Sequence, residues 1–195
     1  MKTIITMFIC LILFAFKGNA QNEKPELLKE PASWQFERFA LPPVFAAGFP
    51  YSGVEELRFS PGMFHKDSSD YFSYAFVAQL NNTTAITQRE IKNYLLLYFK
   101  GLCASTAKQR NLSIDTSQIT VSIEEKSPAV YNATLKVFGV FADGALLTLN
   151  AEIKVLGSIP AKKTYLVFIA SPQRKTHSVW QQLYKIQKGF VLPNK

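Results

Sequence analysis

The one histidine with acidic residues nearby in the sequence is the first place to look for chemistry. His65 is followed by Asp67 and Asp70, with Ser68 and Ser69 between the two acids. A hydrolase site needs a nucleophile, a base and a group that orients the base, and these residue types include all three. They share one short polar loop, however, whereas the members of a hydrolase triad usually come from separate elements. The pattern is more typical of a solvated turn whose Asp and Ser side chains cap backbone groups.

Two adjacent glutamates in a predicted strand are the second candidate for acid–base chemistry. Neighbouring strand residues point to opposite faces of a sheet, so Glu55 and Glu56 cannot act together on one substrate. Glu55 shares its face with Leu57, and a buried carboxylate needs a partner. We expect Glu55 to form a structural ion pair with Arg38, or with Arg58 if the strand twists or ends early.

Cys103 and His177 each have a structural explanation. Cys103 lies on the apolar stripe of a predicted helix, where burial would raise the pKa of the thiol and leave it inert. His177 falls early in the last predicted helix, where a surface position is expected. The sequence contains no phosphate-binding glycine loop, metal-ligand cluster or redox cysteine pair. We therefore expect neither a cofactor nor a metal site, and we assign no catalytic residue.

The first residues have the layout of a secretory signal peptide. Lys2 is followed by an apolar run over residues 4–16 and by small residues up to Ala20. The run is shorter than the roughly 20 apolar residues that span a bilayer. We expect cleavage near Ala20, a secreted or periplasmic protein, and no transmembrane segment in the mature chain. Residues 21–31 are polar with two prolines and predict a flexible leader, followed by a single domain over residues 32–195.

The charge of the chain is moderately basic. The formal net charge of +8 falls to +6 when Lys2 and Lys17 are lost with the predicted signal peptide. This value favours weak attraction to anionic surfaces. No RNA-binding or helix-turn-helix signature accompanies it, so we expect no nucleic-acid partner.

The longest predicted element is a β-hairpin over residues 131–156. Odd-numbered residues are apolar in both of its arms, and they face each other only if the turn has the right length. A two-residue turn would place apolar side chains opposite polar ones. A three-residue loop over residues 142–144, with Gly144 in the left-handed position, pairs Val137 with Leu149 and is therefore predicted. The even-numbered residues form the other face. This face is polar far from the turn and apolar near it, at Phe138, Val140 and Leu146.

Two amphipathic helices are predicted, both packed on the apolar face of the hairpin. The first begins with a capping box from Thr87 to Glu90, flanked by Ile86 and Ile91 as a hydrophobic staple. Its stripe is Ile91, Tyr94, Leu95, Tyr98, Phe99, Leu102 and Cys103. The stripe of the second is Val179, Trp180, Leu183, Ile186, Gln187 and Phe190.

Further strands are predicted over residues 34–41, 54–60, 71–80, 119–124 and 165–170. Together with the hairpin they indicate an α+β fold: a twisted antiparallel sheet of about six to seven strands with two main helices packed on it.

The last quarter of the chain, roughly, and the order of the elements resemble the PsbP/Mog1-like α+β sandwiches. In YLVFIASPQRKTHSVWQQLYKIQKGF an apolar strand ends at a small residue. A helix follows, with Trp180 on its buried face and Phe190 at its end. The first strands do not share the resemblance. It implies a non-enzymatic accessory or interaction module.

The function predicted from the sequence is therefore that of a secreted or periplasmic, non-enzymatic binding or accessory module. The apolar, proline-rich loop over residues 42–50 is typical of a contact site. We expect Phe45 and Phe49, and with them Glu55, Arg58 and His65, to contact an unidentified protein or a small hydrophobic ligand of the envelope. The alternative is a small envelope hydrolase that uses His65 with the nearby carboxylates.

Overall fold

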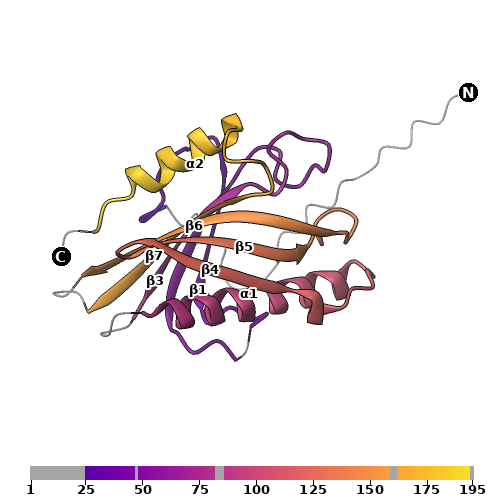
Figure 1. The fold of residues 1–195 in the computed structure, drawn as a ribbon, viewed down its shortest axis with the longest axis horizontal. Helices are drawn as coiled ribbons and strands as arrows, with labels where there is room; N and C mark the ends of the chain where they lie inside the picture. The colour runs from indigo at the N-terminus through magenta and orange to yellow at the C-terminus, as the bar shows by residue number, and fades with distance from the viewer. Residues whose placement is uncertain (1–24, 47, 82–85, 159–161, 194–195) are drawn as a thin grey trace, which may run out of the picture.

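One antiparallel sheet of seven strands lies between two helices in the computed structural model, which describes residues 25–46, 48–81, 86–158 and 162–193 (Figure 1). The strands are β1 (Gln35–Leu41), β2 (Gly53–Phe59), β3 (Tyr74–Leu80), β4 (Thr120–Ser127), β5 (Val130–Phe138), β6 (Leu146–Ser158) and β7 (Lys163–Ser171). Their order across the sheet is β1-β2-β3-β7-β6-β5-β4. The helices are α1 (Gln88–Gln109) and α2 (Ser178–Gly189), and a short 3-10 helix, η1 (Thr116–Gln118), precedes β4. The predicted α+β class and antiparallel sheet are confirmed.

The two helices lie on opposite faces of the sheet (Figure 1), so the prediction that both pack on one face is wrong. The reason lies in β3 and β7, which are neighbours in the middle of the sheet and apolar on both sides. Phe76 and Phe168 belong to the core under α1, whereas Val77 and Val167 belong to the core under α2. A strand that is apolar on both faces needs a cover on both, and one helix supplies each cover.

The hairpin of β5 and β6 has the predicted facing side chains but not the predicted register. Val137 pairs with Leu147 and Leu135 with Leu149, so the pairing of Val137 with Leu149 is wrong by two residues. A shift of two keeps each side chain on its own face, and the apolar odd-numbered residues still meet across the strands.

The connection between β5 and β6 is longer than predicted, and another part of the chain binds it. It covers seven residues, 139–145. The guanidinium of Arg110 donates to the carbonyl oxygens of Phe141 and Ala142. A Cβ added to Gly139 would lie 2.6 Å from the hydroxyl of Tyr71. The Tyr71 hydroxyl thus leaves no room for a side chain at residue 139, and Gly144 does have the expected left-handed backbone, with a φ of 73°.

The start of α1 is as the sequence predicts. The hydroxyl of Thr87 accepts from the backbone N–H of Glu90, and the Glu90 carboxylate accepts from the backbone N–H of Thr87 at 2.7 Å. Ile86 and Ile91, the two residues of the staple, are both buried. Local signals of this kind are satisfied within one turn, so they do not depend on the rest of the fold.

Candidate functional site

Glu55, on the α1 side of β2, is a buried carboxyl group held by two tyrosine hydroxyls. Tyr94 donates to it at 2.7 Å and Tyr98 at 2.9 Å. Burial raises the pKa of Glu55 to about 8, although the two hydrogen bonds oppose this rise. The predicted ion pair of Glu55 with Arg38 or Arg58 is therefore wrong, because α1 supplies neutral donors and both arginines lie on the other face.

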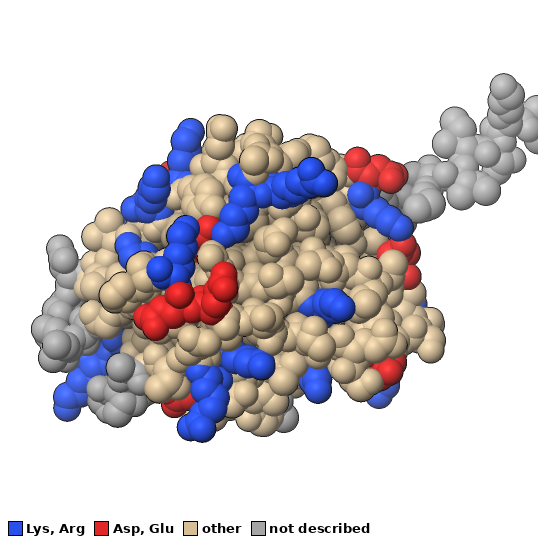
Figure 2. Space-filling view, in the orientation of Figure 1, with Lys and Arg blue, Asp and Glu red and all other residues tan. Residues whose placement is uncertain are grey.

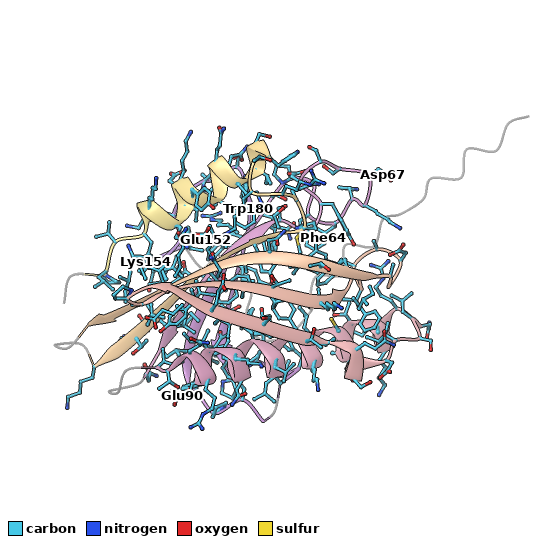
Figure 3. All side chains as sticks on the ribbon, in the orientation of Figure 1. Phe64, Asp67, Glu90, Glu152, Lys154 and Trp180 are labelled. Atoms are coloured by element: carbon cyan, nitrogen blue, oxygen red, sulfur yellow. The ribbon has the colours of Figure 1, made fainter. Side chains whose placement is uncertain are left out.

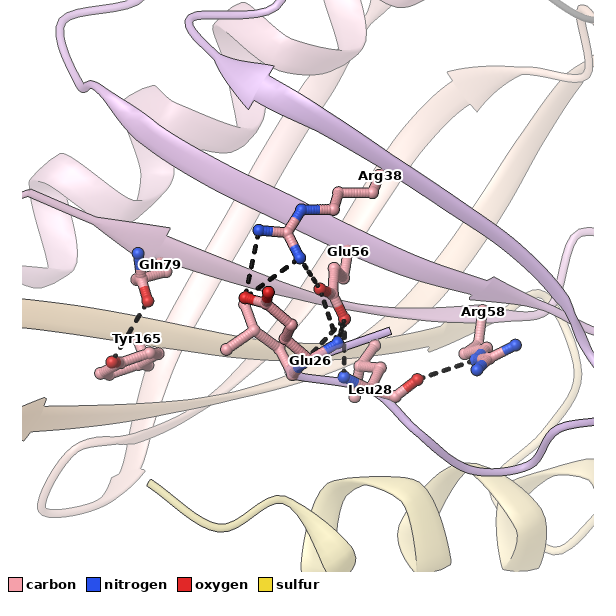
Figure 4. A network of polar contacts seen from close by, with 8 residues as sticks. Glu26, Leu28, Arg38, Glu56, Arg58, Gln79 and Tyr165 are labelled. Atoms are coloured by element: carbon pink, nitrogen blue, oxygen red, sulfur yellow. Dashed lines mark hydrogen bonds and ion pairs between the residues drawn. The ribbon is translucent and has the colours of Figure 1, made fainter. Parts of the chain in front are cut away.

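Glu56, the next residue of β2, is equally buried but faces the α2 side and binds backbone. Its carboxylate accepts from the N–H groups of Glu26 at 3.0 Å, Leu27 at 2.8 Å and Leu28 at 2.9 Å (Figure 4). Arg38 of β1 forms an ion pair with the same carboxylate at 2.8 Å. Hydrogen bonds to a charged group are the stronger kind, so this arrangement holds residues 26–28 firmly against the sheet.

Arg58, two residues further along β2, holds the same segment through its carbonyl groups. Its guanidinium donates to the carbonyl oxygens of Leu28, Lys29 and Trp34, each at 2.9 Å. The ring of Phe36 lies 4.8 Å from the guanidinium carbon, a distance suited to a cation–π contact. Arg58 was predicted to contact a partner, but in this structure its donors are used within the chain.

The segment before β1 is therefore part of the fold. Leu28 is 3% exposed and packs in the core under α2. The predicted flexible leader, residues 21–31, does not fit its described part, residues 25–31, because Glu56 binds its N–H groups and Arg58 its carbonyl groups. The predicted signal peptide, residues 1–20, and residues 21–24 lie outside the described residues.

A groove of about 650 Å³ lies between residues 26–31, which we call the pinned segment, and the end of α2. Residues 26–31 form one wall. The other wall consists of one side of α2 together with residues 190–193. Apolar side chains from both walls line it: Leu27, Leu28, Pro31, Ile186, Phe190, Val191, Leu192 and Pro193. A volume of this size is within the range of small-molecule sites, roughly 300–1,000 Å³.

The apolar loop over residues 42–50 is mostly a cover for the core. Phe49 is buried, and its ring lies 4.5 Å from that of Tyr94. Phe45 is partly buried, 5.1 Å from the ring of Tyr98. Phe49 therefore cannot meet a partner without rearrangement. Among the large hydrophobic side chains in the described part of this loop, Val44 is exposed, at 67%.

The loop that carries His65 does not assemble a triad. His65 is exposed, and within the described residues its imidazole makes no hydrogen bond. Asp70 instead accepts from the hydroxyl of Ser68 and from the backbone N–H of Gly62. These bonds lower the pKa of Asp70, against the opposing effect of burial. Asp67 lies on the outside of the loop, away from the sheet (Figure 3).

Cys103 is buried in the core, and burial raises the pKa of its thiol to about 11. This agrees with an inert cysteine. His177 is the N-cap of α2, where its Nδ1 accepts from the backbone N–H of Val179. Within the described residues, no group of three or more His, Cys, Asp or Glu side chains is placed to hold a metal ion.

A polar cluster joins α2 to β6 beside Trp180 (Figure 3). Glu152 accepts from the ammonium of Lys175 at 2.6 Å and from the hydroxyl of Tyr184 at 2.7 Å. Burial alone would raise the pKa of Glu152, but these two donors lower it overall. The indole N–H of Trp180 donates to the carbonyl oxygen of Gln173. This cluster fixes the start of α2 on the sheet, and with it the direction in which α2 runs toward the groove.

Sequence reasoning missed the residues of the groove. Two signals were present: the apolar pair Leu27 and Leu28 inside a polar leader, and the apolar Val191 and Leu192 beyond the last helix. Neither pair fits an amphipathic period, so periodicity alone does not identify them.

Comparisons with protein-family models, with curated proteins and with solved structures found no match to this chain. Among the described residues, no helix has both the length and the apolar character needed to cross a membrane.

Proposed function

We propose that this chain is a non-enzymatic binding module of the secreted or periplasmic compartment, and that the groove between residues 26–31 and the end of α2 is its ligand site. The ligand is a small molecule with an apolar chain. Its chain lies against Leu27, Phe190 and Leu192, and the groove needs no catalytic group for this role.

The observation that supports this proposal is the exposed apolar lining of a groove with a fixed wall. Val191 is 75% exposed although it lines the groove. Glu56 and Arg58 hold the facing wall by its backbone, so the segment keeps its place without having to bury all of its side chains. An apolar surface kept open in this way is typical of a contact site.

The predicted hydrolase has less support. His65 is exposed, and neither Asp67 nor Asp70 orients its imidazole within the described residues. A base without an orienting partner lacks the arrangement that nucleophilic hydrolases use.

Titration with Nile red, an uncharged apolar dye whose fluorescence rises on binding, tests the proposal. Val191→Asp places a charge in the groove and should weaken dye binding about tenfold, the effect of about 1.4 kcal/mol. The matched control is Val44→Asp, because Val44 is a similarly exposed valine outside the groove. Absence of saturable dye binding, or equal weakening by the two variants, would reject the groove as the ligand site.

A further inference from the structure

The acidic side chains that line the groove have a hydrogen-bond or ion-pair partner, whereas its basic side chains have none within the described residues. The lining contains two acids, Glu26 and Glu30, and two bases, Lys29 and Lys185. Glu26 forms an ion pair with Arg38 at 3.2 Å. The carboxylate of Glu30 accepts from the backbone N–H of Ala32 at 2.9 Å. Glu26 therefore has a cationic partner, whereas the partner of Glu30 is a neutral backbone group.

The ammonium groups of Lys29 and Lys185 are exposed and have no hydrogen bond or ion pair within the described part of the chain. Lys29 belongs to the pinned segment and Lys185 to α2, so the two walls contribute one positive charge each. Lys and Arg side chains also gather over α2 in the space-filling view (Figure 2). An anion in the groove would meet two lysines and, among the described lining residues, one carboxylate that forms no ion pair, that of Glu30.

The end of α2 limits where such an anion can lie. The last carbonyl groups of a helix carry partial negative charge, which repels anions. Lys185 stands before the final turn, whereas Phe190, Val191 and Leu192 follow it. A charged head group therefore fits beside Lys185 and Lys29, and an apolar chain fits along residues 190–192.

We propose that the ligand of the groove is an anionic amphiphile, a single apolar chain with an anionic head group such as a fatty acid, and that Lys29 and Lys185 bind the head group from opposite walls. This inference rests on the proposed function of the groove and adds the class of ligand. The charge complementarity of the two lysines selects an anionic head over a neutral or a cationic one.

Displacement of Nile red by three twelve-carbon amphiphiles tests the inference: dodecanoate, dodecanol and dodecylammonium, each below its micelle concentration. Dodecanoate should bind the tightest, by roughly threefold to tenfold over dodecanol, the gain expected from two exposed charge pairs. Added salt should reduce this preference. Dodecyl phosphate as a fourth competitor separates a general anion site from one that favours carboxylates.

The Lys29→Gln/Lys185→Gln variant should lose the preference for dodecanoate and keep its affinity for dodecanol. The matched control is Lys92→Gln/Lys136→Gln, which removes the same charge from exposed positions on α1 and β5 outside the groove. All four lysines are exposed, and a thermal melt of each variant checks that the fold is kept.

The possible outcomes separate the two proposals. Equal displacement by dodecanoate and dodecanol, or equal loss of the preference in both double variants, overturns the anionic ligand and leaves the groove as an apolar site. Dye binding that no amphiphile displaces also overturns it, and points to a peptide as the occupant. Failure of the protein to bind the dye overturns the proposed function itself.

Discussion

Glu55 and Glu56 are neighbours on one strand and both have 0% exposure, yet the two faces of the sheet hold them by different means. On the α1 face, Glu55 has two neutral donors and burial raises its pKa to about 8. On the α2 face, Glu56 has a guanidinium and three backbone N–H groups. Two buried carboxyl groups of one strand therefore differ in their donors, which are neutral hydroxyls for Glu55 and a guanidinium with backbone N–H groups for Glu56.

The α1 face and the α2 face of the sheet also differ in their roles. The tyrosines that hold Glu55 lie within one continuous aromatic core, where Tyr94 and Tyr98 stack at 6.2 Å. The partners of Glu56 belong to residues 26–28, which form a wall of the groove. We infer that the Glu55 side stabilises the fold, whereas the Glu56 side shapes the candidate site.

The largest effect is expected from Glu56→Ala. The change leaves the N–H groups of residues 26–28 without their acceptor and removes one of the ion-pair partners of Arg38, at 2.8 Å. Loss of charge-assisted hydrogen bonds costs about 1.5–3 kcal/mol, measurable by urea unfolding. Amide hydrogen exchange of residues 26–28 should also accelerate.

Glu124→Ala, at an exposed position of β4, is the control and should change stability by less than about 0.5 kcal/mol. Equal losses in the two variants would contradict the role of Glu56.

The second prediction concerns the pH dependence that Glu55 gives to stability. Its pKa is about 8 in the folded protein and 4.5 without the fold, so the folded state binds the proton more tightly. This contribution to stability is complete below pH 4.5 and is lost as the pH rises through about 8, by at most about 1.4 kcal/mol per pH unit.

Glu55→Gln removes the titration and keeps the shape of the side chain. In thermal melts from pH 5 to pH 9, the melting temperature of the variant should fall less than that of the unchanged protein. Parallel curves for the two proteins would show that Glu55 is already ionised at pH 5.

A smaller loss is expected from Tyr98→Phe, which removes one of the two hydroxyls bound to Glu55. The loss of a hydrogen bond to a buried group costs about 1–2 kcal/mol in unfolding free energy. Because that bond lowers the pKa of Glu55, its removal should extend the pH-dependent loss of stability to higher pH. The control is Tyr131→Phe, whose buried ring has a hydroxyl without a hydrogen bond among the described residues. It should be nearly neutral, and an equal cost in both variants would argue against the bond.

The smallest effect is expected from His65→Ala, because the side chain of His65 is exposed, unlike the buried carboxyl groups of Glu55 and Glu56. Its unfolding free energy should stay within about 0.5 kcal/mol of the unchanged protein. On a panel of ester, phosphate and peptide substrates, any turnover should be the same before and after the change. Loss of a measurable activity in this variant would instead restore the hydrolase hypothesis.

Much of the fold could be predicted from local patterns, and much of the candidate site could not. The stripe of α1, its capping box and the shared face of the odd-numbered residues in β5 and β6 were correct because each depends on neighbours within a turn or along a strand. The faces of Phe138 and Val140 were wrong, because both are buried in the core under α1. The hairpin register was wrong because the connection covers residues 139–145, and a residue about thirty positions earlier, Arg110, donates to the carbonyl of Phe141 within it. The partners of Glu55 were wrong because its hydroxyl donors lie 39 and 43 residues away.

The sequence by itself determined which residues become helix or strand, and which side chains share a face. Those properties follow from periods of 3.6 and 2 residues, which the chain carries locally. Only the tertiary structure decided that the two helices take opposite faces and that Glu56 and Arg58 bind a segment expected to be a flexible leader. The physical reason is that a buried charge selects its partners from whatever the fold brings within hydrogen-bond distance. For Glu56 those partners are backbone groups 28 to 30 residues earlier in the chain, so their identity follows from tertiary packing and from no local pattern.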